Sequence, residues 1–120
     1  MKILIVEDET MTLKMLSMKL KKDGYEVIQA EDGRMAMEYI EKEGCPDMVI
    51  TDIMMPFFSG LEVVEKVRKQ LLSKIPIIVL SAMGQEESVS SAFALGADDY
   101  ITKPFNPNEL SMRVKRLIGL

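Results

Sequence analysis

Residues 48–52 read Met48-Val-Ile-Thr-Asp52, a short apolar run that ends in an acidic residue. The 120-residue chain has four more such runs, at 3–6, 27–30, 77–80 and 100–102, of which the run at 27–30 is the weaker one. Strands that are apolar at nearly every position suit a sheet buried on both faces, which is typical of parallel sheets. With the quoted run taken as 48–51, the pattern predicts five buried strands.

Segments of helical length and periodicity alternate with these runs, at 10–22, 33–43, 60–72, 85–95 and 107–118. Asp32 and Ser59 are suited to cap the starts of two helices, and a glycine follows three of the helices, at Gly24, Gly44 and Gly96. This alternation predicts one α/β domain over residues 1–120, a flavodoxin-like (βα)5 doubly wound sandwich with strand order 2-1-3-4-5. Such folds bind ligands beyond the carboxyl ends of strands 1 and 3, where the strand order reverses.

The composition excludes several classes of protein. The chain is 48% apolar and 28% charged, as globular proteins are, and no apolar run approaches the length of a membrane span. The net charge of −4 argues against a nucleic-acid-binding face, which needs a basic patch. Cys45 is the single cysteine and the N-terminus lacks a signal-peptide pattern, so we expect a cytoplasmic protein without an internal disulfide.

Polar side chains follow four of the five predicted strands at their carboxyl ends, where they share one edge of the sheet. They are Glu7 and Asp8 after the first strand, Asp52 after the third, Ser81 after the fourth and Lys103-Pro104 after the fifth. Neighbouring strands lie about 5 Å apart, a distance at which two carboxylates repel by ~3 kcal/mol at an effective dielectric near 20. A divalent cation among them outweighs this repulsion, and Mg²⁺ suits a site with few carboxylates and a phosphate oxygen. The pattern therefore predicts a Mg²⁺ site, with Mn²⁺ as the alternative.

Each of these residues alone has a simpler interpretation. Asp8 alone is typical of a helix cap or a solvated turn, Ser81 alone of an N-cap for a helix that starts near Met83, and Lys103 alone of a surface lysine. Their joint position at one edge favours the metal site.

Four ordered motifs closely resemble the receiver domain of two-component response regulators, over residues 2–118. They are Glu7-Asp8, the run Asp52-Ile-Met-Met-Pro56 with Gly60, Ser81-Ala82, and Gly96-Ala-Asp-Asp-Tyr100-Ile-Thr-Lys103-Pro104-Phe105. The resemblance implies a signalling switch that accepts a phosphoryl group on Asp52 in a magnesium-dependent reaction. It implies self-catalysed transfer and autodephosphorylation rather than an enzyme that turns over a separate substrate.

The resemblance also implies a role for each motif residue. Asp8 and Asp52 would bind the metal directly, together with the backbone carbonyl of Met54, while Glu7 would act directly or through water. Lys103 would pair with Asp52 and then with a phosphoryl oxygen, and its peptide bond to Pro104 would be cis. Ser81 would donate a hydrogen bond to the phosphoryl group, after which Tyr100 would turn inward and alter the surface of the fourth helix, fifth strand and fifth helix.

The partners implied by the resemblance are a sensor histidine kinase or a histidine phosphotransfer protein, and an output domain or effector, with transcription as one output. Met11, Met15 and Met18 form an apolar stripe on the first helix, opposite its core-facing leucines. The stripe either packs on neighbouring loops or docks the kinase, since methionines adapt well to partner surfaces. Met54 and Met83, two residues beyond Asp52 and Ser81, predict slow self-dephosphorylation because they hinder water.

We expect a monomer or a phosphorylation-dependent dimer. Related receivers dimerise through cross-subunit salt bridges, for which this chain offers Asp98, Asp99, Glu109, Arg113 and Lys115. The fourth helix contains no cation, which weakens that expectation.

Three rival functions remain open on the sequence. One is a receiver-shaped interaction module that is never phosphorylated, and another is an aspartate-based phosphatase of the haloacid dehalogenase type. The phosphatase, however, would carry Asp-x-Asp after its first strand, where this chain has Glu7-Asp8. A flavodoxin-like electron carrier would need a hydroxyl-rich phosphate loop at the same place.

Overall fold

The computed structural model describes residues 1–119, and Leu120 lies outside the described residues. Five parallel strands form one sheet in the order β2-β1-β3-β4-β5, which confirms the predicted fold class and strand order. The strands are β1 (Lys2–Val6), β2 (Glu26–Ala30), β3 (Met48–Asp52), β4 (Ile77–Ser81) and β5 (Asp99–Thr102).

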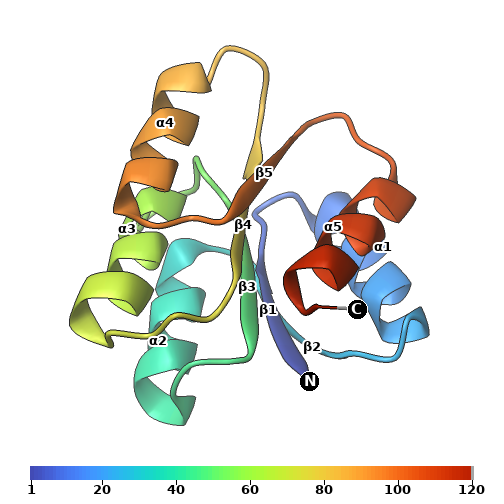
Figure 1. Ribbon diagram of the computed structural model, residues 1–120, viewed down its shortest axis with the longest axis horizontal. Helices are drawn as coiled ribbons and strands as arrows, with labels where there is room; N and C mark the ends of the chain where they lie inside the picture. The colour runs from blue at the N-terminus through green and yellow to red at the C-terminus, as the bar shows by residue number, and fades with distance from the viewer. Residues whose placement is uncertain (120) are drawn as a thin grey trace.

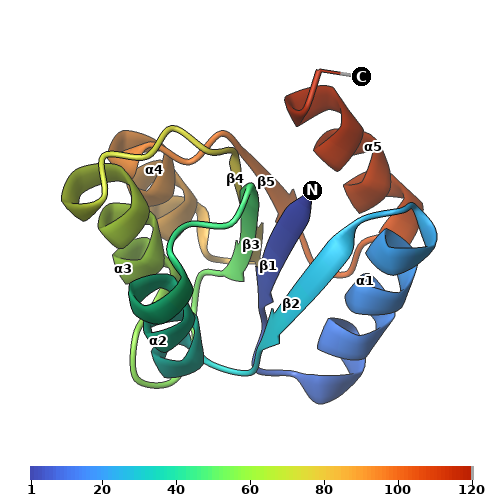
Figure 2. The ribbon, with the colours of Figure 1, turned by 90° about the horizontal axis from the view of Figure 1, so that it is seen from below.

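The helices form two layers, one on each face of the sheet. In Figures 1 and 2, α1 and α5 cover one face, and α2, α3 and α4 cover the other. Their bounds are α1 (Thr10–Lys22), α2 (Gly33–Glu43), α3 (Gly60–Glu65), α4 (Glu86–Leu95) and α5 (Pro107–Leu117). Two apolar clusters fill the layers, and β1, β3 and β4 contribute to both because side chains alternate between the faces. No helix among residues 1–119 is long and apolar enough to cross a membrane.

The predicted helix signals are largely confirmed. The Asp32 carboxylate accepts a hydrogen bond from the Met35 amide at 2.8 Å, and the Ser59 hydroxyl accepts one from the Glu62 amide at 3.3 Å. Gly44 and Gly96 end their helices with φ of 85° and 115°, a backbone conformation that favours glycine.

The prediction of one regular helix over 60–72 is wrong. The α-helix ends at Glu65, a π-helical segment, η1 (Lys66–Gln70), follows it, and Leu72 has a φ of 53°. The Arg68 side chain explains where the helix ends, because it donates hydrogen bonds to the carbonyls of Ser73 and Gly96 and pairs with Asp98 at 2.9 Å. These partners are distant in the sequence, and helical periodicity carries no information about them.

Candidate functional site

An acid cluster lies at the carboxyl end of the sheet. Glu7, Asp8 and Asp52 each offer a carboxylate oxygen, and these three atoms lie within 4.8 Å of one another. The register brings them together, because Val6 of β1 is paired with Thr51 of β3 and the acids follow directly. Glu7 is completely buried and Asp52 is buried, while Asp8 is exposed. Asp8 is not the capping residue of α1, since Glu9 occupies that position.

Lys103 reaches the acid cluster from the end of β5. Its Nζ lies 2.5 Å from Glu7 Oε1 and 3.0 Å from Asp52 Oδ2. Burial alone lowers the pKa of the Lys103 ammonium, but the hydrogen bonds and charges of Glu7 and Asp52 outweigh that effect and raise its pKa. Lys103 therefore stays protonated and joins the end of β5 to the ends of β1 and β3.

One ammonium does not balance three carboxylates, and the electrostatics of the cluster reflect this. Burial raises the pKa of Glu7, and the hydrogen bond with Asp52 and its charge add to that rise. Burial also raises the pKa of Asp8, with Glu7 as the second cause. The folded protein thus holds these carboxylates in a setting that disfavours their charge.

The acid cluster fits a divalent cation. Glu7 Oε1 is buried and has the Lys103 ammonium 2.5 Å away as its ion-pair partner. A single ammonium is shared between Glu7 and Asp52 and leaves the charge of the three acids uncompensated, which a divalent cation would offset. Three acidic oxygen donors in one cluster match the ligand preference of Mg²⁺.

Asp52 is held by a close approach of backbone that requires a glycine. The Gly60 amide donates a hydrogen bond to the Ile53 carbonyl at 2.7 Å, and a Cβ atom on Gly60 would lie 2.1 Å from the Asp52 carbonyl oxygen. The Ile53 amide in turn donates to the Leu80 carbonyl, and the Thr51 hydroxyl donates to the Asp52 carbonyl. The start of α3 therefore rests directly on the backbone of Asp52.

The loop between β3 and α3 is fixed by a second glycine. A Cβ atom on Gly33, the first residue of α2, would lie 2.0 Å from the Phe58 carbonyl oxygen. Phe57 has a φ of 70°, and the Arg34 guanidinium lies 4.5 Å from the centre of its ring. Sequence reasoning missed these contacts, since an aromatic residue with positive φ carries no pattern of its own.

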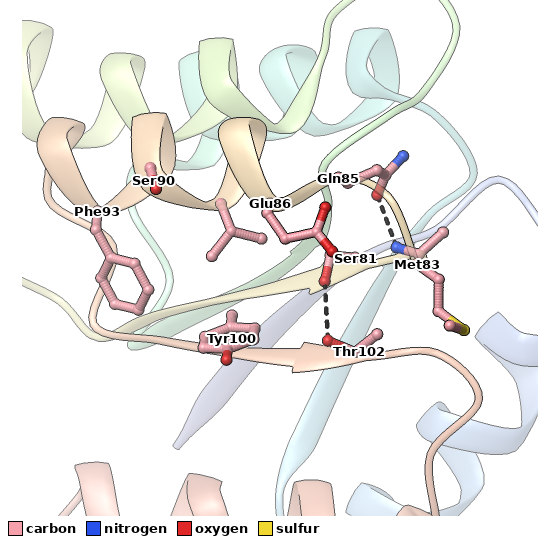
Figure 3. A pocket seen from close by; sticks show the side chains of 10 residues that line it. Ser81, Met83, Gln85, Glu86, Ser90, Phe93, Tyr100 and Thr102 are labelled. Carbon is pink, nitrogen blue, oxygen red and sulfur yellow. Dashed lines mark hydrogen bonds between the residues drawn. The ribbon is translucent and has the colours of Figure 1, made fainter.

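Ser81 is the last residue of β4, and Tyr100 lies on β5, across β4 from Asp52. Ser81 is buried at the end of β4, so its interpretation as a helix N-cap is wrong; α4 begins at Glu86, after Gln85. The Tyr100 side chain is 42% exposed and meets the Phe93 ring edge-to-face, with 5.9 Å between centroids. Figure 3 shows both residues beside a groove of about 540 Å³ between α4 and β5.

The remaining predicted residues are not part of the acid cluster. The side chains of Met54 and Met83 are exposed, by 57% and 81%. Met11, Met15 and Met18 are exposed on α1, and Met15 also lines a hollow with Lys103 and Phe105 of the loop after β5. The Lys103–Pro104 peptide bond is cis.

Four of the five charged residues considered for a dimer, all except Lys115, form ion pairs within the described chain. Buried Asp99 accepts hydrogen bonds from Arg113 at 2.7 Å and from Arg116 at 2.8 Å. Arg113 also pairs with Glu109 at 3.2 Å, and Asp98 pairs with Arg68. Cross-subunit pairing of these groups would therefore compete with contacts that the monomer already makes.

Comparison with known proteins finds relatives that match this chain over nearly its whole length. A family model described as "Response regulator receiver domain" matches residues 3–115. The chain is 42% identical over 117 residues to the alkaline phosphatase synthesis transcriptional regulatory protein PhoP of Bacillus subtilis, covering 98% of this chain and 48% of that protein. The chain thus spans about half the length of the curated relatives it matches.

Two solved structures share the fold and more than 30% sequence identity with this chain. The chemotaxis response regulator CheY4 of Vibrio cholerae is 37% identical with a TM-score of 0.87, covering 97% of each chain. The receiver domain of the Francisella response regulator 1452 is 33% identical with a TM-score of 0.86, covering 97% of this chain and 94% of that one.

Proposed function

This chain belongs to the response regulator receiver domain family of two-component signalling, and from that premise we propose that it accepts a phosphoryl group on Asp52. The observation that carries the proposal is the 3.0 Å ion pair of Lys103 with Asp52 inside a cluster of three acids. A carboxylate held beside a fixed ammonium is a competent nucleophile for phosphorus, because transfer needs mostly positioning and charge neutralisation.

The proposed transfer uses a phosphohistidine of a sensor kinase or phosphotransfer protein, or a small acyl phosphate. An Asp52 carboxylate oxygen attacks the phosphorus, the new O–P bond forms, and the bond to the donor imidazole nitrogen breaks. The imidazole leaves with the electron pair of that bond and takes up a proton. Lys103 then pairs with a phosphoryl oxygen and offsets part of the added charge, which is about −1.5 to −2.

Magnesium, with Mn²⁺ as the alternative, would be held by Asp8, Asp52 and the Met54 carbonyl, with Glu7 binding directly or through water. When bound, the ion supplies positive charge that neutralises the acids and the transferred phosphoryl oxygens. The cluster of three carboxylates, with one ammonium between Glu7 and Asp52, supports this assignment.

The switch would follow from the same charge. Ser81 donates a hydrogen bond to a phosphoryl oxygen, the loop between β4 and α4 moves toward Asp52, and Tyr100 turns from its exposed position into the groove. Phosphorylation must favour this second packing over the first for the population to shift. The altered surface of α4, β5 and α5 would then control an output domain or effector.

The exposed methionines on α1 support a docking site for the kinase or phosphotransfer protein. Replacing Met11 and Met18, which do not line the hollow beside Lys103, by glutamate should reduce transfer from the cognate kinase by about a hundredfold, the scale of 2–3 kcal/mol for buried interface anchors. Labelling by acetyl phosphate should not change, because the acid cluster is untouched. Equal loss in both assays would instead indicate a damaged fold.

The direct test of the proposal is incubation with Mg²⁺ and acetyl phosphate, followed by intact-mass measurement. We expect the wild type to gain one phosphoryl group and Asp52→Asn to gain none, while Glu38→Gln, an exposed acid on α2, behaves as the wild type. Labelling of Asp52→Asn would reject Asp52 as the acceptor. Absence of labelling in the wild type would favour a pure interaction module, and steady hydrolysis of added phosphate esters would favour the phosphatase alternative.

A further inference from the structure

Two hydrogen bonds connect the loop between β4 and α4 to Thr102 and to Gln85. Neither Thr102 nor Gln85 takes part in the proposed phosphoryl transfer. The Ser81 hydroxyl lies 3.4 Å from the Thr102 hydroxyl of β5. The Ala82 amide donates to the Gln85 side-chain carbonyl at 2.7 Å. Figure 3 shows both contacts along the groove between α4 and β5.

Thr102 reaches Ser81 because the two residues are paired in register across β4 and β5. Along β5, Ile101 is buried, while Tyr100 and Thr102 are exposed on the side of the groove. β5 and β3 lie on opposite sides of β4, so a contact with Thr102 directs the Ser81 hydroxyl away from Asp52. This is the only hydrogen bond of the Ser81 side chain to residues 1–119.

Gln85 fixes the other half of the loop. It precedes the first residue of α4, and its side chain turns back to the Ala82 amide, closing a short turn in which Gly84 has a φ of 88°. While this contact exists, the Ala82 amide is not free to donate to another acceptor. A rearrangement of the loop that gives the Ala82 amide a different acceptor has to break this contact.

We propose that Thr102 and Gln85 are positioning residues that hold residues 81–85 in the resting arrangement and set how readily phosphorylation of Asp52 moves them. The inference rests on the proposed function, because it concerns the loop that Ser81 would carry to the phosphoryl group. The Ser81 side chain adopts one rotamer at a time, so turning its hydroxyl toward a phosphoryl oxygen on Asp52 gives up the contact with Thr102, whichever hydroxyl donates in it. A separation of 3.4 Å is long for two hydroxyls, whose usual distance is about 2.8 Å, so the contact is weak enough to exchange.

The expected effect of each contact follows from the net strength of a neutral hydrogen bond. Removing one such bond from the resting arrangement alone shifts the equilibrium by about fivefold. A ligand that binds only the shifted arrangement then binds about fivefold more tightly, because a larger fraction of the free protein is competent.

The test uses beryllium fluoride with Mg²⁺ as the phosphoryl mimic, in a titration followed by the amide NMR signals of Ala82 and Tyr100. Thr102→Val keeps the shape but lacks the hydroxyl, and Gln85→Met keeps the length but lacks the acceptor. We expect Gln85→Met to lower the half-saturating concentration about fivefold, and Thr102→Val, which removes the longer contact, to lower it about twofold. Thr102→Ser, which keeps the hydroxyl, should stay close to the wild type, a rescue that a purely structural role of Thr102 would not give.

The outcomes distinguish a failure of this inference from a failure of the proposed phosphorylation. If the wild type does not respond to beryllium fluoride, the proposed phosphorylation fails first. If the wild type responds and both Thr102→Val and Gln85→Met match it, the positioning roles are wrong while the phosphorylation stands. Thermal unfolding of each variant checks the fold. If Thr102→Val does not fold, Gln85→Met, which lies at the start of α4, still tests whether the contacts of the loop set its response to beryllium fluoride.

Discussion

The two sides of β4 are built differently, although they lie within one small domain. Toward β3 and β1, Glu7 and Asp52 are buried, and Lys103 joins them at 2.5 and 3.0 Å. Toward β5, Ser81 makes one long hydrogen bond at 3.4 Å, and Tyr100 lies half exposed beside an open groove. The first side is held by charge and close backbone packing, whereas at the groove of the second side the Ser81 contact is long and the Tyr100 ring is half exposed. Phosphoryl transfer needs groups fixed in advance, whereas a switch needs two arrangements of similar free energy.

The largest expected effect tests the rigid side. Lys103→Met removes the ammonium that neutralises Asp52, so we expect the rate of labelling by acetyl phosphate to fall by about 10²–10³-fold, as for other groups that stabilise transferred charge. The rate is measured by intact mass over time at saturating Mg²⁺. Lys115→Met, on the exposed surface of α5, is the matched control. A fall of less than threefold in Lys103→Met would mean that the ion pair is structural only.

The next prediction concerns Met54 and Met83, which follow β3 and β4 at the mouth of the site. Met54 and Met83 are exposed, and apolar side chains at the mouth of the site should hinder water. Replacing both by glutamine should raise the rate of phosphoryl loss by about tenfold, which corresponds to about 1.4 kcal/mol in the barrier. The decay is followed after removal of acetyl phosphate, with Met112→Gln on α5 as the control. An unchanged decay rate in the double variant would reject the shielding role.

Much of this difference between the two sides could be predicted from the sequence, and the reason is local. The five apolar runs specify the strands, and each acid or lysine of the rigid side directly follows one, so topology alone brings them to one edge. Gly60 was visible in its motif, but its contact with the Asp52 backbone needs coordinates.

The groove side of β4 could not be predicted in the same way. Thr102 and Gln85 are ordinary polar residues, and their partners are fixed by the pairing of β4 with β5 and by one turn of loop. The break in the helix after Glu65 likewise depends on the contact of Arg68 with residues near β5. Side-chain contacts between distant segments leave no periodic signal, and they are the contacts that decide how easily this side moves.

The destabilising effect of the buried Glu7 charge can be tested by varying the pH in metal-free solution. The pKa of Glu7 is raised in the folded protein, chiefly by burial, so its contribution to stability is present below pH 4.5 and is lost as the pH rises through the folded pKa. Glu7→Gln keeps the shape without the charge, and we expect it to raise the Tm at pH 7 by about 5 °C, the scale of 1 kcal/mol for a domain of this size. The gain should disappear at pH 4 and in saturating Mg²⁺, as measured by thermal unfolding. A lower Tm at pH 7 would show that the ion pair with Lys103 outweighs the desolvation of Glu7.

The smallest expected effect concerns Tyr100, and it tests most directly whether the groove side of β4 is independent of the chemistry at Asp52. The ring is half exposed and its edge-to-face contact with Phe93 contributes only about 0.5–1.5 kcal/mol beyond burial. Tyr100→Leu keeps an apolar side chain at the groove, so we expect the free energy of unfolding in urea to change by less than about 1 kcal/mol. Labelling by acetyl phosphate should change by less than about twofold, since no group that holds Asp52 is altered. A tenfold loss of labelling would show that the groove side is coupled to the chemistry before any switch occurs, and the division between a fixed side and a movable side of β4 would have to be abandoned.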